Sequence, residues 1–212
     1  MTVAILADEL IKQEILAKKL PDGITVVWVD SMSALTITEA DVYMDLLFEM
    51  NTERTQHLKK LLPNPVFVNA VSYTTKSIGA DLIRINAWPG LLQRSITEIA
   101  LPAGVAESTV KNIFDLWQWK YIVAPDITGM ITARVLAAII NEAYFTLGDK
   151  VSTREEIDIA MKLGTSYPYG PFEWSTKIGL KRIYELLQEL SRTDERYQPA
   201  PLLKEEATGK KA

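Results

Sequence analysis

The residue types best suited to chemistry in this chain are carboxylates, and two of them stand where a helix begins. Val3–Leu6 is predicted to be an apolar strand, and Asp8 and Glu9 follow it at the start of the next helix. A pyrophosphate bound at such a turn needs glycines, because they let the backbone approach the phosphates closely. Carboxylates instead stabilise the positive end of the helix dipole and repel a phosphate from the same place. This turn predicts an acid-capped structural helix.

Histidine and cysteine chemistry is limited by the scarcity of both residues. The chain has no cysteine, which excludes disulfides, thiol catalysis and cysteine-ligated metals. Its single histidine, His57, is predicted on a solvated helix face beside Lys59 and Lys60, which favours neither a metal site nor a general base. A further candidate is Asp30, at the end of a predicted strand, where a binding role competes with ordinary turn chemistry.

The composition is that of a folded, mildly acidic protein. Apolar residues make up 48% of the 212, enough for a sizeable core. The net charge is −4 and no basic stripe is present, which argues against nucleic acid as a partner. No uncharged apolar run approaches the roughly 18 residues of a membrane span, and the acidic N-terminal segment is unlike a signal peptide. We therefore expect a cytoplasmic protein without a membrane partner.

Short apolar strands alternate with helices through residues 1–125. Helices are predicted after the first strand, over 52–62 and over 105–117. Strands are predicted over 3–6, 24–29, 42–48, 66–68, 80–85, 95–101 and 121–123. An apolar strand, a helix and a second apolar strand form the signature of a parallel sheet that is covered on both faces. The pattern predicts a doubly wound α/β domain.

Residues 130–147 are predicted to form a central helix of a second, all-α domain. Apolar residues cover two of its faces: Ile131, Val135 and Ile139 on one, and Leu136, Ile140 and Tyr144 on the other. A helix this apolar is expected to be buried on both faces, and its polar edge and short length argue against a membrane span.

Local signals mark the ends of the helices that follow. Gly148 is expected to end the central helix. Ser152 and Glu155 are expected to form a capping box that starts a second helix, which closes at Gly164. Residues 165–174 are rich in aromatic residues, glycine and proline and are predicted to form a rigid turn that packs its rings against both helices.

Several short motifs in this second domain carry a family resemblance. They are Asn141-Glu142-Ala143, Ala160-Met161-Lys162-Leu163-Gly164, Tyr167-Pro168, Gly170-Pro171-Phe172-Glu173, Ile178-Gly179-Leu180 and Pro199-Ala200-Pro201-Leu202-Leu203-Lys204. In this order and spacing they resemble the C-terminal helical domain of 3-hydroxyacyl-CoA dehydrogenases. The resemblance implies a reduced Rossmann-like domain over 1–125 and a helical dimerisation domain over 126–205, with a mobile tail at 206–212.

The resemblance also implies where the cofactor NAD of this family would bind. The three glycine positions of its phosphate-binding turn fall on Ala7, Glu9 and Lys12, so none is kept. Asp30 corresponds to the acidic residue that bonds the ribose hydroxyl, and Glu49 to a strand-end glutamate near cofactor and substrate. With the phosphate turn lost, we expect no bound cofactor, and Asp30 and Glu49 as remnants of a cofactor site.

The family's catalytic residues are only partly matched. Its general base is a histidine oriented by a downstream glutamate, and Glu98 resembles that glutamate. If the family's histidine segment is aligned to residues 85–89 without a gap, the histidine position falls on Ile85. Ser72 fits the serine that helps bind the substrate oxygen, and the asparagine that contacts the reacting oxygen falls on Ala133. Glu98 and Ser72 are therefore the candidate catalytic remnants.

Three functions follow from this interpretation. The favoured one is a catalytically silent family member that forms a homodimer, or a heterodimer with an active dehydrogenase, through residues 126–205. The second is an active NAD-dependent 3-hydroxyacyl-CoA dehydrogenase with a rearranged site. The third is a non-catalytic module that binds acyl-CoA, for which Lys162 and the aromatic turn at 167–172 are candidates.

Overall fold

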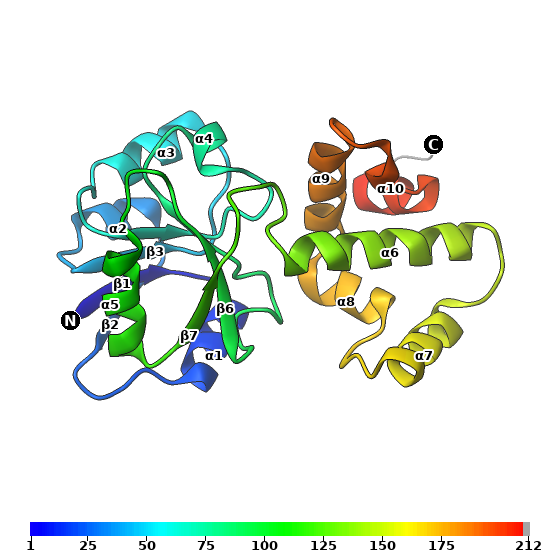
Figure 1. Cartoon of the computed structure of the whole chain (residues 1–212), viewed down its shortest axis with the longest axis horizontal. Helices are drawn as coiled ribbons and strands as arrows, with labels where there is room; N and C mark the ends of the chain where they lie inside the picture. Colours follow the sequence, from blue (N-terminus) through cyan, green and yellow to red (C-terminus); the bar gives the residue numbers. More distant parts are fainter. Residues whose placement is uncertain (210–212) are drawn as a thin grey trace. The chain divides into compact units, whose positions relative to one another are not determined.

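The computed structural model describes residues 1–209 and divides the chain into two compact units, Met1–Met130 and Ile131–Ala212 (Figure 1). The first unit is built on a sheet and the second consists of helices. Within the described residues, no helix is both long and apolar enough to cross a membrane.

A seven-stranded sheet forms the centre of the first unit, in the order β2-β1-β3-β4-β5-β6-β7. Its strands are β1 (Thr2–Leu6), β2 (Thr25–Val29), β3 (Val42–Asp45), β4 (Val66–Val68), β5 (Ile83–Ile85), β6 (Ile96–Ala100) and β7 (Lys120–Val123). Neighbours run parallel except β5 and β6, which are antiparallel. All seven predicted strands exist, and the α/β prediction is confirmed.

Helices cover both faces of this sheet (Figure 1). They are α1 (Glu9–Lys18), α2 (Met32–Ile37), α3 (Thr52–Lys59), α4 (Thr75–Ile78) and α5 (Glu107–Trp117). Side chains alternate along the strands between two cores: Val3 and Ile5 join one buried cluster with Phe67, whereas Ala4 and Leu6 join the other. Burial on both faces explains why these strands are continuously apolar.

Two elements of this unit end earlier than the sequence predicted. β3 stops at Asp45 instead of residue 48. The fully buried Asp45 carboxylate accepts two hydrogen bonds from Arg54, at 2.7 and 2.6 Å. Burial raises the pKa of Asp45, although the Arg54 guanidinium opposes that rise. α3 ends at Lys59 instead of residue 62.

The second unit is a helical bundle. Its elements are α6 (Thr132–Gly148), α7 (Arg154–Thr165), α8 (Pro171–Ile178), α9 (Leu180–Ser191), the 3₁₀ helix η1 (Glu195–Tyr197) and α10 (Pro201–Thr208). Asn141 on α6 joins two of them: its Nδ2 donates to the Gln198 carbonyl at 2.9 Å, and its Oδ1 accepts from the Ala200 backbone N–H at 2.8 Å. A buried amide with both ends bonded fixes the start of α10 against α6.

The prediction that α6 is buried on both apolar faces is wrong. Leu136, Ile140 and Tyr144 are buried, but Ile131 is 42% exposed and Val135 is 53% exposed. α8, α9 and α10 pack on the buried face of α6. The helix begins at Thr132 and not at Met130 as predicted.

The capping box of α7 is shifted by one residue from the prediction. The Thr153 hydroxyl accepts from the Glu156 N–H, and the Glu156 carboxylate accepts from the Thr153 N–H at 3.2 Å. Ser152 donates its hydroxyl to that same carboxylate at 2.6 Å, so it supports the cap without forming it. α7 continues through Gly164 to Thr165.

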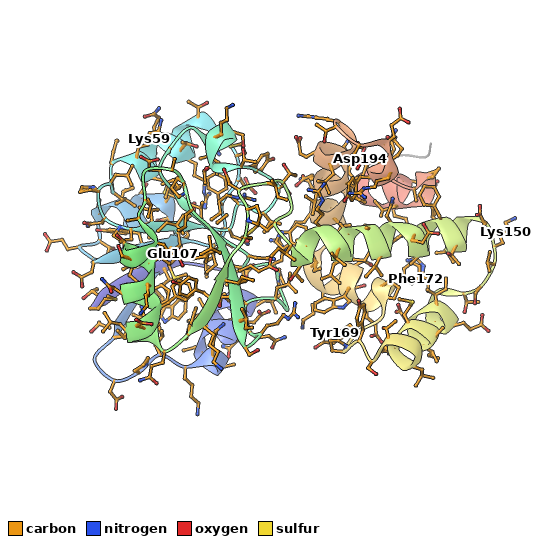
Figure 2. The ribbon with its side chains drawn as sticks, in the orientation of Figure 1. Lys59, Glu107, Lys150, Tyr169, Phe172 and Asp194 are labelled. Atoms are coloured by element: carbon orange, nitrogen blue, oxygen red, sulfur yellow. The ribbon has the colours of Figure 1, made fainter. Side chains whose placement is uncertain are left out.

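The predicted rigid turn is present over residues 166–170, but the last four residues of the predicted range already belong to α8. Asp158 on α7 reaches the first turn of α8 and accepts hydrogen bonds from the backbone N–H groups of Phe172 (2.8 Å) and Glu173 (3.2 Å). Phe172, labelled in Figure 2, lies with its ring centroid 5.1 Å from that of Tyr144 on α6 and 4.8 Å from Arg154 on α7. The aromatic residues thus pack as expected, but from a helix.

The structure places the unit boundary and the last helix differently from the sequence. Asp126 belongs to the first unit, because it accepts hydrogen bonds from Arg84 at 2.7 Å and from the Thr75 N–H at 3.0 Å. Burial alone would raise the pKa of Asp126, but these hydrogen bonds outweigh it and lower the pKa. Glu206 lies in α10 and pairs with Arg154 of α7, although a mobile tail was predicted from residue 206 onward. Residues 210–212 of that predicted tail lie outside the described part of the chain.

Candidate functional site

The place to look for a site is the edge where the parallel strands of the first unit end. β1 lies between β2 and β3, so the strand order reverses at β1. Ligands of such sheets bind outside the carboxyl ends of the strands, next to the strand where the order reverses. The register of β1 and β2 sets Leu6 beside Val29, which puts Asp30 next to the turn that follows β1. The ends of β3, β4 and β5 complete the edge.

The turn after β1 is closed by its own carboxylate. Asp8 is the N-cap of α1, and its Oδ1 accepts from the Ile11 backbone N–H at 2.9 Å. Glu9 stands in the first turn, within 3.8 Å of Lys12, and accepts from Gln13 at 2.6 Å. Two carboxylates thus occupy the N-terminus of the helix, where a pyrophosphate would need free N–H groups. The acid cap predicted from the sequence is confirmed, and these residues do not fit a dinucleotide.

Glu98 is held by Asn86 in the buried part of the edge. The Asn86 side-chain Nδ2 donates to Glu98 Oε2 at 3.0 Å, and the Asn86 backbone N–H donates to the Glu98 carbonyl at 2.9 Å. Asn86 is 3% exposed and Glu98 9%. Ile85, the residue that corresponds to the family's histidine when no gap is introduced, is fully buried in the core of the sheet.

The Asn86 side chain limits what this pair can do chemically. An amide donates and accepts hydrogen bonds, but it does not take up a proton near neutral pH. A histidine oriented by a carboxylate can act as a general base, whereas an asparagine beside a carboxylate cannot. The pair is therefore suited to holding the loop after β5 against β6.

Asn69 ties together three of the loops at this edge, a role that the sequence did not reveal. Its Nδ2 donates to the carbonyls of Leu46 and Ala87, both at 3.2 Å, and its Oδ1 accepts from the Ala87 N–H at 3.1 Å. Each loop follows a different strand, so the loop ends are fixed relative to one another. Its neighbour Ser72, the predicted candidate, lies half-buried in the turn after β4.

Helix α1 anchors the loop between β5 and β6 with two side chains one turn apart. The Glu14 carboxylate accepts from the backbone N–H groups of Gly90 at 2.5 Å and Gln93 at 3.1 Å. The Lys18 ammonium donates to the Leu92 carbonyl at 3.2 Å and to the Arg94 carbonyl at 2.8 Å. It also donates to the Thr97 hydroxyl in β6 at 2.6 Å. Burial lowers the pKa of Lys18 to about 8. These bonds fix the segment that also carries Asn86.

The remaining predicted residues lie apart from this buried pair. Asp30 is exposed at the end of β2, and the next residue, Ser31, caps α2 by accepting from the Ala34 N–H at 3.2 Å. Glu49 is exposed beyond the end of β3. In the second unit, Lys162 donates to Glu173 at 2.5 Å and so joins α7 to α8. Among the described residues, no group of histidine, aspartate or glutamate side chains could hold a metal ion.

The comparisons with known proteins agree on one family. The family model for the C-terminal domain of 3-hydroxyacyl-CoA dehydrogenases matches residues 129–211. A 3-hydroxyadipyl-CoA dehydrogenase of Escherichia coli (strain K12) is 39% identical over 116 residues, which are 53% of this chain and 24% of that protein. A 3-hydroxybutyryl-CoA dehydrogenase of Bradyrhizobium diazoefficiens is 42% identical over 83 residues, which are 38% of this chain and 28% of that protein. The chain thus spans about a quarter of the length of these curated relatives.

The fold comparison extends over both units. The crystal structure of (S)-3-hydroxybutyryl-CoA dehydrogenase from Ralstonia eutropha has a TM-score of 0.73 to this chain at 19% identity, covering 98% of this chain and 93% of that one. At that identity the match shows a shared fold, a Rossmann-type sheet domain followed by a helical domain. Residues 129–211 are thus similar in sequence to the C-terminal domain of 3-hydroxyacyl-CoA dehydrogenases, and the chain as a whole shares the fold of such an enzyme.

Proposed function

We propose that this chain is a catalytically silent member of its family that acts by association, as a homodimer or as the partner of an active dehydrogenase. The observation that carries the proposal is the Asp8 cap: its carboxylate already bonds the Ile11 N–H at the helix N-terminus. Without a place for the pyrophosphate, the chain lacks the hydride acceptor that oxidation of a 3-hydroxyacyl thioester requires.

The pair of Asn86 and Glu98 supports the same proposal from the side of proton transfer. Asn86 contacts Glu98 through an amide nitrogen at 3.0 Å, and an amide is no general base. Loss of a general base alone typically costs about 10² to 10⁴ in rate. Loss of the cofactor as well leaves no residual reaction.

The surface of the helical unit supports the association. Ile159 and Leu163 stand one turn apart on α7 and are 53% and 82% exposed, and Val151, just before α7, is 71% exposed. Exposed apolar side chains gathered in one segment favour a protein–protein contact. α7 itself buries only Ile157 and Asp158, so most of its surface is available to a partner.

The test of silence is an activity assay with the purified full chain. Reduction of acetoacetyl-CoA by NADH, followed by the loss of NADH absorbance, is expected to stay at the rate without protein. A turnover above that background, abolished by Glu98→Gln, would instead establish the active alternative with a rearranged site.

The test of association is the mass under native conditions. Alone, the chain is expected to have the mass of a dimer; if it is a monomer alone, it must form a 1:1 complex with an active dehydrogenase of the same family. A monomer in both experiments contradicts the proposal.

A further inference from the structure

Strand β2 forms one edge of the sheet, and part of its backbone points outward. The Thr25 N–H donates to the Met1 carbonyl at 2.9 Å, and in a parallel pair alternate residues face the neighbouring strand. The backbone N–H and C=O groups of residues 25, 27 and 29 therefore face β1. Those of Val26 and Trp28 point away from β1, toward the open edge of the sheet. Within the described part of the chain, no residue bonds to these outward groups.

This edge lacks the features that usually protect an edge strand. Thr25–Val29 reads Thr-Val-Val-Trp-Val, without lysine, proline, glycine or any charge, and all of these residue types favour strands. The other edge strand, β7, begins with the exposed Lys120. The Lys12 ammonium lies 5.4 Å from the centre of the Trp28 ring, above its face. An apolar edge of this kind is a template for pairing with another strand.

We propose that β2 pairs with β2 of a second copy of this chain, antiparallel, about a two-fold axis at Val27. Val26 of each copy then faces Trp28 of the other, and these outward residues exchange backbone hydrogen bonds in both directions. Val27 faces its own equivalent in the closer, non-bonded position. Val–Trp pairs across strands are among the favourable combinations of an aromatic and a β-branched side chain.

The side chains of β2 and the charges beside it favour this register. Val26 and Trp28 pack against one core cluster of the sheet and Val29 against the other, so the pairing continues both apolar layers into the second copy. Sliding the axis to Val26 would set Asp30 of each copy opposite Asp22 of the other, and like charges placed opposite each other destabilise such a pair. With the axis at Val27, Asp30 faces Ile24.

This contact is separate from the association through the helical unit, so it is tested by a probe that reports on β2 alone. The chain has no cysteine, and Val27→Cys places one thiol on the proposed axis. Across a non-bonded antiparallel pair the Cα atoms are about 4.5 Å apart, within the range of a disulfide. Thr25→Cys is the matched control, because it lies on the same strand face but opposite Val29 of the other copy.

Under mild oxidation, most of the Val27→Cys protein is expected to migrate as a disulfide dimer on non-reducing gels. The Thr25→Cys protein is expected to give at least tenfold less dimer. Little dimer from Val27→Cys, or equal amounts from both variants, would overturn the proposal, whatever the helical unit does.

A second pair of variants tests the backbone bonds. Val26→Pro removes an outward N–H and leaves the bonds to β1 intact, whereas Val26→Thr keeps that N–H. Both variants are made in the Ile159→Glu/Leu163→Glu background, in which the α7 surface no longer associates. Sedimentation is expected to show a dissociation constant of the β2 contact that is at least tenfold higher in Val26→Pro and unchanged in Val26→Thr. Equal association of both variants would overturn the proposal, and if Val26→Pro does not fold, the cross-linking result decides.

Discussion

Asp8 is the residue on which the proposed loss of the cofactor depends. Its carboxylate satisfies the Ile11 N–H at 2.9 Å and stands at the positive end of α1. The same atoms that stabilise the helix therefore exclude a phosphate. A capping role and a ligand-binding role make different predictions for substitutions at this position.

If Asp8 is a cap, Asp8→Ala should lower the free energy of unfolding by about 1 kcal/mol. Asp8→Asn should change it much less, because an amide oxygen accepts the same hydrogen bond. Urea unfolding followed by circular dichroism measures both. Asp22→Ala, in an exposed turn, is the control and should be neutral; an Asp8→Ala protein as stable as the wild type would contradict the cap.

Lys18 gives the anchored loop a dependence on pH. Burial lowers its pKa from the ordinary lysine value of 10.5 to about 8 in the folded chain. Between these values the unfolded state binds more protons than the folded state, so the free energy of unfolding rises with pH. Below pH 8 both states carry the charge and the dependence vanishes.

The wild type should therefore gain stability from pH 8 to pH 10 relative to Lys18→Met, in which this group is missing. Urea midpoints of the two proteins at pH 7, 8, 9 and 10 measure the difference. A constant difference would show that Lys18 keeps an ordinary pKa, and a change in the opposite direction would show that folding raises its pKa.

Residue types alone predicted part of this site. The acid cap at Asp8 follows from a strand, a carboxylate and a helix in sequence, all of which are local. The partner of Glu98 was missed, because it depends on how β5 pairs with β6. The antiparallel register sets Ile85 beside Ile99 and so brings Asn86 to Glu98, and no local pattern contains that information.

At the scale of elements, the joint between α7 and α8 depends on a glycine. Asp158 reaches across to cap α8, and a Cβ on Gly170 would lie 2.3 Å from its Oδ1 and 2.5 Å from its Cα. Because the contact includes backbone, the helices cannot adjust without moving apart. Gly164, inside α7, has no atom within 4 Å of the place of its Cβ.

Gly170→Ala should destabilise the chain by about 1–3 kcal/mol, the usual cost of overpacking. Gly164→Ala should stabilise it by roughly 0.5–1 kcal/mol, because alanine is the better helix former. Thermal unfolding of both variants gives the comparison. Equal effects of the two alanines would mean that α7 and α8 are not held together at Asp158.

Elements were predictable where their signals are local. All the strands of the sheet and the helices α1, α3, α5, α6 and α7 follow from apolar periodicity and caps. α8 was taken for a turn, because its N-terminus is satisfied by Asp158, 14 residues earlier in the chain. The cap of α7 was placed one residue early, because Ser152 and Thr153 are equally able to cap and only geometry selects Thr153.

At the scale of the whole molecule, the exposed side chains of α7 are the proposed association surface. The apolar composition of α6 was interpreted as full burial, yet Val135 is 53% exposed. On α7, Ile159 is 53% exposed and Leu163 is 82% exposed. A sequence shows which side chains are apolar, but whether the same chain or a second one covers them is decided by tertiary packing.

Ile159→Glu/Leu163→Glu should therefore abolish association through the helical unit without unfolding it, because both side chains are exposed already. Native mass spectrometry at micromolar concentration measures the loss, with each variant made in the Val26→Pro background so that the β2 contact does not contribute. Glu155→Gln, on the same helix and exposed, is the control and should associate like the wild type. Unchanged association of the double variant would place the contact elsewhere.

The proposed loss of a pyrophosphate site at the start of α1 is tested by calorimetric titration of the full chain with NADH. No saturable heat is expected up to millimolar nucleotide, because the Asp8 and Glu9 carboxylates occupy the helix N-terminus. Saturable binding of one NADH per chain with a micromolar dissociation constant would contradict it.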